Sequence, residues 1–498
     1  MIFDFSRRLK RPLPPLPPAA APGDVAYGMS ESGQLILRPR GSTRVASHQV
    51  AMGASGSGKS VREADYLCRM MVYEWLSVPP AQQASLVVID PKGDLVQHLL
   101  DAICATHPQA LRSGLVGYCN PFARHELGEP GGIPLNFAKA ELSGIPESVV
   151  ALQFSSMISA VSTGVGGQKH LSMGARQMDL TNMLLAACLA CPIPECSLLW
   201  ALDAIQGDML KELAALTTSR RAAEFLRTAD LGGELAASTS SRLRTALALY
   251  DGLENAVGAR TCVSISSMVS AGRVTLIDLG PAPLPSLAEC FGNILFSLLS
   301  AHLLARPSPS TAFPHCTCVL DEGHMLAEAL ENTALFWTTL GRSKNLSLTV
   351  LTQGTKLLAE RSPQLLSSLQ TNANIKSIAR MSAPDAEQWV RDAASRPGVE
   401  ESLSAVRSRL VGVVTNLADQ EFLYLTAGSA VRAHSLPVDL AAWTAAGVAH
   451  AADVDAVKRR WTPPEGFPPR VQLADYLAAH KSTAARPARS GKPRSKWG

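Results

Sequence analysis

The glycine-rich segment at 53–60 has the residue types and spacing that most directly specify a chemistry. In a loop of this kind, glycines let the backbone curl until successive N–H groups point at phosphate oxygens. Lys59 would reach the β and γ phosphates, and the hydroxyl of Ser60 would ligate Mg²⁺. We therefore predict a site for ATP and Mg²⁺ that is formed by Gly53, Ala54, Ser55, Gly56, Ser57, Gly58, Lys59 and Ser60.

A chance glycine turn is the alternative explanation for this segment, and the flanking sequence argues against it. The apolar run HQVAM precedes the loop, and a helical pattern at about 60–76 follows it. A strand before the loop and a helix after it are the context that phosphate binding requires, since the helix N-terminus adds the positive end of its dipole.

Three apolar runs typical of strands end in aspartate: VVID at Asp90, TLID at Asp278 and CVLDE at Asp321. Only the third aspartate is followed by a second acid, Glu322. We predict that Asp321 holds the Mg²⁺ shell and that Glu322 polarises the attacking water, because hydrolysis needs a base near the γ phosphate. Asp278 is interpreted as a strand-end residue with no chemistry.

Two further segments place polar side chains where the expected strands end. In DPKGDL, which Asp90 opens, Lys92 and Asp94 would project from the carboxyl edge of the sheet, where ligands bind in such folds. Asp90 and Lys92 are predicted to bind the nucleotide. The alternative is a capped turn between a strand and a helix. Gln353 ends the run LSLTVLTQ and is predicted to touch both the γ phosphate and the water; the alternative is a polar strand terminus.

Arg342 lies just ahead of that last run, in LGRSKN. From there it would not reach its own glycine loop easily, but it could reach the loop of a neighbouring subunit in a ring. It would then act as an arginine finger, an element typically worth about 10³–10⁵ in rate. A surface ion-pair arginine is the alternative.

The order of the expected elements predicts an α/β fold with a doubly wound, mainly parallel sheet. Apolar residues recur at helical spacing between about 145 and 260, which indicates an inserted all-helical domain. The predicted division is a basic, proline-rich segment at 1–28, a nucleotide-binding domain at 29–145 and 261–445, the helical insertion at 146–260, a C-terminal helical segment at 446–480 and a disordered basic tail at 481–498.

Composition excludes several classes of protein. The chain of 498 residues is 46% apolar and 18% charged, so it is globular rather than disordered. Its net charge of +4 means that any DNA-binding surface must be a local patch. The cysteines at 188, 191 and 196 have a spacing like that of metal ligands, but they occupy an apolar run and are interpreted as packing residues.

The motifs together resemble those of the type IV secretion coupling proteins of the TraG/TraD class, which are relatives of the FtsK and HerA translocases. The resemblance covers roughly residues 30–440. It rests on HQVAMGASGSGKS, VVIDPKGDL, VLDEGHML and LGRSKNLSLTVLTQG in this order, with the helical domain between the second and third motifs. It implies a RecA-like P-loop NTPase fold, in which Lys59 and Ser60 match Walker A, Asp321 and Glu322 match Walker B, Arg342 matches the finger arginine and Gln353 matches the motif-3 glutamine.

The resemblance also implies a function: a hexameric ring that uses ATP to move single-stranded or duplex DNA, with its relaxase, toward other secretion-system subunits. Members usually begin with two membrane-spanning helices. No stretch of this chain has the roughly 20 uninterrupted apolar residues of such a span, so we expect a cytoplasmic protein whose contact with the inner membrane, if any, goes through partners. The alternative function is an ATP-binding assembly or regulatory subunit of a secretion or defence complex that moves no DNA.

Overall fold

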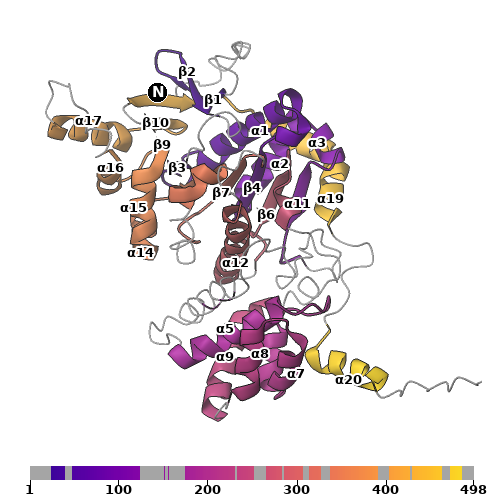
Figure 1. The fold of residues 1–498 in the computed structure, drawn as a ribbon. Helices are drawn as coiled ribbons and strands as arrows, with labels where there is room; N and C mark the ends of the chain where they lie inside the picture. The colour runs from indigo at the N-terminus through magenta and orange to yellow at the C-terminus, as the bar shows by residue number, and fades with distance from the viewer. Residues whose placement is uncertain are drawn as a thin grey trace, which may run out of the picture.

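The computed structural model describes residues 24–39, 48–123, 151, 155, 174–229, 233–251, 265–282, 285–306, 313–326, 337–390, 403–426, 429–461 and 471–484. Within them the strands form one large sheet flanked by helices (Figure 1). Arg342 and several other residues inside helices are described by their backbone alone.

The sheet has eleven strands in the described residues, in the order β2-β1-β11-β10-β9-β3-β8-β7-β4-β6-β5. From β9 to β5 all neighbours run parallel, and β2, β1, β11 and β10 extend this block as antiparallel strands. The bounds are β1 Asp24–Ser30, β2 Leu35–Pro39, β3 His48–Met52, β4 Ser85–Asp90, β5 Val116–Cys119, β6 Val274–Asp278, β7 Cys316–Leu320, β8 Leu346–Thr352, β9 Ala373–Ile378, β10 Glu421–Thr426 and β11 Ser429–Ser435.

The central strands are continuous apolar runs because helices cover both faces of the sheet. In β4, Leu86 and Val88 belong to one apolar core, and Val87 and Ile89 belong to the other. The first core includes α1 (Lys59–Ser77) and α2 (Asp94–Thr106), and the second includes α12 (Pro285–Leu304) and α15 (Pro363–Asn372). This two-faced burial confirms the expected doubly wound arrangement.

Further helices pack around these. The elements α3 (Gln109–Arg112), α11 (Ile265–Met268), α14 (Thr355–Arg361), α16 (Ala383–Val390) and α17 (Leu403–Thr415), with the 3-10 turns η2 (Pro80–Gln82) and η4 (Gly341–Lys344), join or flank the strands. The helices α5 (Ala175–Leu189), α6 (Trp200–Gln206), α7 (Leu210–Leu216), α8 (Arg220–Thr228) and α9 (Gly233–Asp251) pack on one another as a separate group (Figure 1). Cys188, Cys191 and Cys196 are buried there in an apolar core, as expected of packing residues.

Of the helices after residue 439, α18 and α19 pack against the sheet and its helices, and α20 packs against the helical group α5–α9. Helix α18 (Leu440–Ala449) packs on α2, and α19 (Ala451–Arg459) packs on β5. The guanidinium of Arg460 donates to the carbonyl oxygens of Val116 (2.7 Å) and Leu111 (2.6 Å). By contrast α20 (Leu473–Ala484) contacts α6, where the indole Nε1 of Trp200 donates to the carbonyl oxygen of residue 471 at 2.9 Å.

Three segment boundaries of the sequence-based division cut through regular elements. Strand β1 begins at Asp24, inside the expected lead segment 1–28, because its residues pair with β2 and β11. The boundary at 445 falls within α18, and α20 continues to Ala484, past the expected start of the tail at 481. Residues 1–23 and 485–498 lie outside the described residues.

A buried polar cluster joins α1 to the antiparallel strands. The guanidinium of Arg38 on β2 pairs with the carboxylate of Glu63 on α1 at 2.8 Å, and both side chains are buried. Arg38 also lies between two aromatic rings, 4.3 Å from the ring centroid of Tyr27 and 4.4 Å from that of Tyr66. The hydroxyl of Tyr27 donates to Glu63 as well. The helix that follows the glycine loop is thus tied to the far part of the sheet.

Candidate nucleotide-binding site

The glycine loop connects β3 to α1, and its backbone requires glycine. Gly53, Gly56 and Gly58 have φ angles of 151°, 77° and 80°, a region that L side chains rarely adopt. A Cβ at Gly53 would lie 2.6 Å from the Cβ of Ala379, and one at Gly58 would lie 2.8 Å from Oε1 of Gln420. The conformation therefore disfavours a side chain at all three positions, and the contact with Ala379 adds to this at Gly53.

Lys59 lies inside this loop. Its Nζ donates to the carbonyl oxygens of Gly53 at 2.5 Å and of Ala54 at 3.0 Å. Burial lowers the pKa of Lys59, while Glu322 and Asp321 act in the opposite direction. The ammonium therefore stands between the loop and the acidic ends of the strands, as a phosphate-binding lysine must.

Other atoms of the loop suit phosphate. Ala54, Ser55 and Gly56 are exposed at its tip, and Gly58 and Ser60 are half-buried. The hydroxyl of Ser57 is buried and makes no hydrogen bond within the described residues. A buried hydroxyl without a partner and a turn of left-handed glycines fit a bound phosphate chain.

Asp321 and Glu322 directly follow β7, and Glu322 has an unusual backbone conformation. Its φ is 46°, which is uncommon for a residue with a side chain and typical of strained functional positions. Oε1 of Glu322 accepts from Nε2 of Gln353 at 2.6 Å and pairs with the Nζ of Lys92. Oε2 lies 3.4 Å from Nδ1 of His324. The predicted Glu322, Gln353 and Lys92 therefore meet at one point, although they come from three different strand ends.

Asp321 is buried beside two other acids. Burial, Asp90 and Glu322 raise its pKa to about 8, and the ammonium of Lys59 opposes this shift. A divalent cation would relieve the repulsion, and Mg²⁺ typically uses one or two carboxylates together with substrate phosphates. Within the described residues no group of three or more His, Cys, Asp or Glu side chains could hold a metal by itself. The donors that are present therefore fit an Mg²⁺ ion bound jointly by Asp321, Ser60 and a triphosphate.

Asp90 has the geometry of a cap. Its Oδ1 accepts from the backbone N–H of Lys92 at 2.9 Å, and its Oδ2 accepts from that of Val96 at 3.0 Å. These bonds close the turn between β4 and α2, which is the arrangement that the alternative interpretation of DPKGDL describes. Burial raises the pKa of Asp90. Asp278 accepts from the Tyr118 hydroxyl at 2.7 Å and from the backbone N–H of Gly280 at 3.0 Å.

The backbone of Arg342 belongs to η4, immediately ahead of β8. The direction of its side chain lies outside what the structure describes. Its role as a finger therefore stays a prediction.

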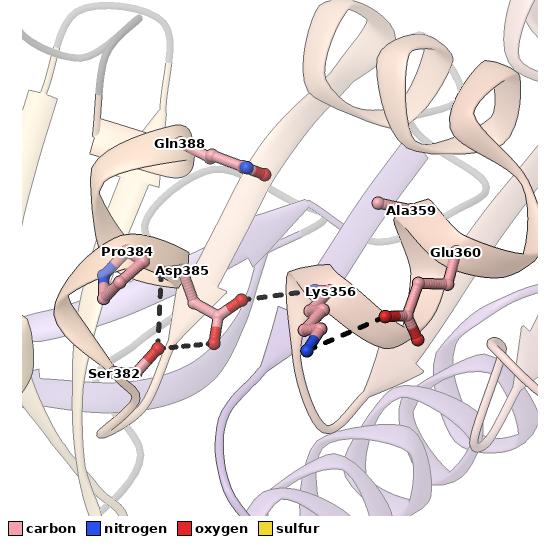
Figure 2. Close-up of a pocket in the computed structure, with 7 residues that line it drawn as sticks. All are labelled: Lys356, Ala359, Glu360, Ser382, Pro384, Asp385 and Gln388. Atoms are coloured by element: carbon pink, nitrogen blue, oxygen red, sulfur yellow. Dashed lines mark hydrogen bonds and ion pairs between the residues drawn. The ribbon is translucent and has the colours of Figure 1, made fainter.

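Sequence reasoning missed a cap that supports Gln353. Helix α14 begins two residues after Gln353, and Oδ1 of Asp385 on α16 accepts from the backbone N–H groups of Thr355 and Lys356, each at 3.2 Å. The hydroxyl of Ser382 holds the other oxygen of Asp385 at 2.6 Å (Figure 2). A surface pocket of about 450 Å³ lies between α14 and α16 beside this cap. The Ser-x-x-Asp spacing predicts the start of α16, but no local signal indicates that Asp385 also caps α14.

His324 was also missed as a neighbour of Glu322. Burial lowers its pKa, while Glu322 acts in the opposite direction. It stands in the segment GHML directly after the acidic pair, and nothing in that segment singles it out as a neighbour of Glu322.

Comparison with solved structures identifies the fold. The chain is similar to VirB4 of Thermoanaerobacter pseudethanolicus with a TM-score of 0.54 and 13% identity, and the match covers 85% of this chain and 99% of that one. The chain folds as a P-loop NTPase. The resemblance drawn from the motifs is thereby confirmed at the level of the fold.

Other comparisons add less. The bacterial conjugative coupling protein TrwBΔN70 matches with a TM-score of 0.47 and 15% identity, over 83% of this chain and 90% of that one. A structure of the plasmid coupling protein TrwB with ADP and Mg²⁺ matches with a TM-score of 0.46, also at 15% identity, over 83% of this chain and 90% of that one. No protein-family model matches the chain, and no curated protein does. Among the helices that the structure describes, none is long and apolar enough to cross a membrane.

Proposed function

We propose that this protein is an ATP-hydrolysing motor of the type IV secretion coupling kind, which moves DNA from the cytoplasm with the energy of ATP. The observation that carries the proposal is the meeting of Glu322, Gln353 and Lys92 beside a loop that already holds Lys59 inward. A site built only to retain a nucleotide has no need of a carboxylate base at this position.

In the proposed reaction, Lys59 and the backbone N–H groups of the loop bind the phosphates. Asp321 and Ser60 hold Mg²⁺, which supplies charge neutralisation when it is bound. Glu322 takes the proton of the attacking water as the bond from the γ phosphorus to the bridging oxygen breaks, and the products are ADP and phosphate. Gln353 orients the water and reports the loss of the γ phosphate to α14.

The oligomer and the substrate are the finer parts of the proposal. We propose a homo-oligomer, a hexameric ring in which Arg342 reaches the site of the adjacent subunit. DNA and its relaxase, and other secretion-system subunits, are the proposed partners. These parts rest on the resemblance of the motifs to those of coupling proteins.

The experiment measures ATP turnover of the purified protein with and without single-stranded and duplex DNA. We expect hydrolysis that DNA stimulates, and we expect Lys59→Ala to abolish it because the phosphate-facing charge is lost. Turnover that Lys59→Ala leaves intact would refute the site. Turnover that neither form of DNA changes would favour the alternative, an assembly or regulatory subunit that moves no DNA.

A further inference from the structure

Neither oxygen of the Glu322 carboxylate is open to a water molecule in this conformation. Oε1 receives both the ammonium of Lys92 and the amide of Gln353. Oε2 is buried, makes no hydrogen bond within the described residues, and lies 3.4 Å from Nδ1 of His324. A general base must present an accessible oxygen to the water that it deprotonates. Here one oxygen is occupied and the other is enclosed, so Glu322 is held in a resting arrangement.

Lys92 is the partner that is free to leave. Its side chain is 42% exposed, whereas that of Glu322 is 8% exposed. The turn around Lys92 does not depend on its ammonium, because Asp90 holds that turn through backbone N–H groups. Lysine is a compact charge on a flexible stem, so the ammonium can move while the backbone stays fixed.

The ammonium of Lys92 points toward the strands that flank the glycine loop. It meets Oε1 of Glu322 together with the amide of Gln353, and Gln353 follows β8, the neighbour of β3. From the end of β4, Lys92 therefore extends past the end of β7 toward the strands that flank the glycine loop. A half-exposed ion pair contributes little, and a charge-assisted bond to phosphate contributes more.

We infer that Lys92 senses the γ phosphate: it pairs with Glu322 until ATP binds, then exchanges that carboxylate for the γ phosphate and so frees the base. ADP lacks this group and leaves Lys92 on Glu322. Lys92 is thus a residue that selects ATP over ADP and positions Glu322, a role that rests on the proposed function.

The test is a double-mutant cycle of nucleotide affinity, measured by equilibrium titration with Mg²⁺ and either a non-hydrolysable ATP analogue or ADP. Lys92→Met should weaken binding of the analogue about tenfold and change ADP binding by less than about twofold. Glu322→Gln removes the competing ion pair and should tighten binding of the analogue about threefold. In the Lys92→Met background, Glu322→Gln should produce no such tightening. Lys356→Met, at a surface lysine that is 82% exposed, is the matched control and should leave both affinities unchanged.

The cycle separates the exchange from plain electrostatics. Equal tightening by Glu322→Gln in both backgrounds would mean that the carboxylate merely repels the γ phosphate, and it would overturn the role of Lys92. Equal weakening of analogue and ADP by Lys92→Met would overturn it too. A wild-type protein that binds neither nucleotide would instead refute the proposed function itself.

Discussion

Breaking the buried ion pair beneath the nucleotide loop should destabilise the protein strongly. Nη1 of Arg38 lies 2.8 Å from Oε2 and 3.1 Å from Oε1 of Glu63, and the two side chains are 1% and 0% exposed. Arg38→Met keeps most of the side-chain volume but removes the charge that neutralises Glu63. Removing one partner of a buried pair typically costs roughly 3–5 kcal/mol, because the other charge stays buried without compensation.

The assay is thermal and urea unfolding followed by tryptophan fluorescence. We expect the free energy of unfolding to fall by roughly 3–5 kcal/mol and the melting temperature of this 498-residue chain to fall by about 3–5 °C. Adding Glu63→Gln to Arg38→Met should restore part of the stability, because the carboxylate that has lost Arg38 is then no longer buried; Arg62 stays buried beside Tyr27 in both variants. The control is Arg112→Met, which breaks an ion pair with Asp453 whose arginine is 67% exposed and should leave the stability close to that of the wild type.

Two results would refute this reasoning. Arg38→Met within about 0.5 kcal/mol of wild type would mean that the pair contributes nothing to stability. Further loss on adding Glu63→Gln would mean that Tyr27 and the buried Arg62, rather than Arg38, stabilise the carboxylate.

Three other predictions concern activity and pH. Subunits with Arg342→Ala and subunits with Lys59→Ala should each be inactive but regain ATP hydrolysis when mixed, since some interfaces then join an intact loop to an intact arginine; no recovery in proven mixed oligomers would place Arg342 in its own subunit. Asp385→Ala should remove the cap of α14 and lower the free energy of unfolding by about 1 kcal/mol. It should also lower ATP turnover, because the cap supports Gln353; unchanged turnover would show that the cap has no part in catalysis. Burial lowers the pKa of His315 to about 4, so the folded protein binds fewer protons there than the unfolded chain. Stability should therefore be present in full above pH 6.5 and should fall by up to about 3 kcal/mol toward pH 4, and His315→Gln should flatten the melting temperature over this range.

The sequence predicts the central sheet well because its signals are local. The run SLVVID is apolar on both faces, and the structure buries every residue of β4. The glycine loop, the strand ends at Asp321 and Gln353 and the hairpin of β10 and β11 are likewise encoded in short segments.

Contacts between distant segments have no such local signal. Arg38 and Glu63 are significant because they form an ion pair with each other. The sequence around either residue does not predict that β2 lies beside α1. The sequence does not decide whether Asp90 binds a ligand or caps a helix, because an aspartate at a strand end suits both roles. Only the positions of the backbone N–H groups of α2 distinguish the two. The return of α20 to α6 is equally long-range, since it joins residues 471–476 to Trp200 and Asp203.

The packing of α19 and Arg460 on β5 also bears on how fragments of this chain would behave in solution. Strand β5 is an edge of the sheet, and an uncovered edge offers its carbonyl and N–H groups to the strands of other molecules. Arg460 occupies the carbonyl oxygen of Val116, and the ring of Trp461 lies so close to Gly117 that a Cβ there would be 2.3 Å from Cζ2. The C-terminal helices thus protect this edge from intermolecular pairing. A fragment that ends before Leu440 would retain every residue of the nucleotide site and yet expose an aggregation-prone strand.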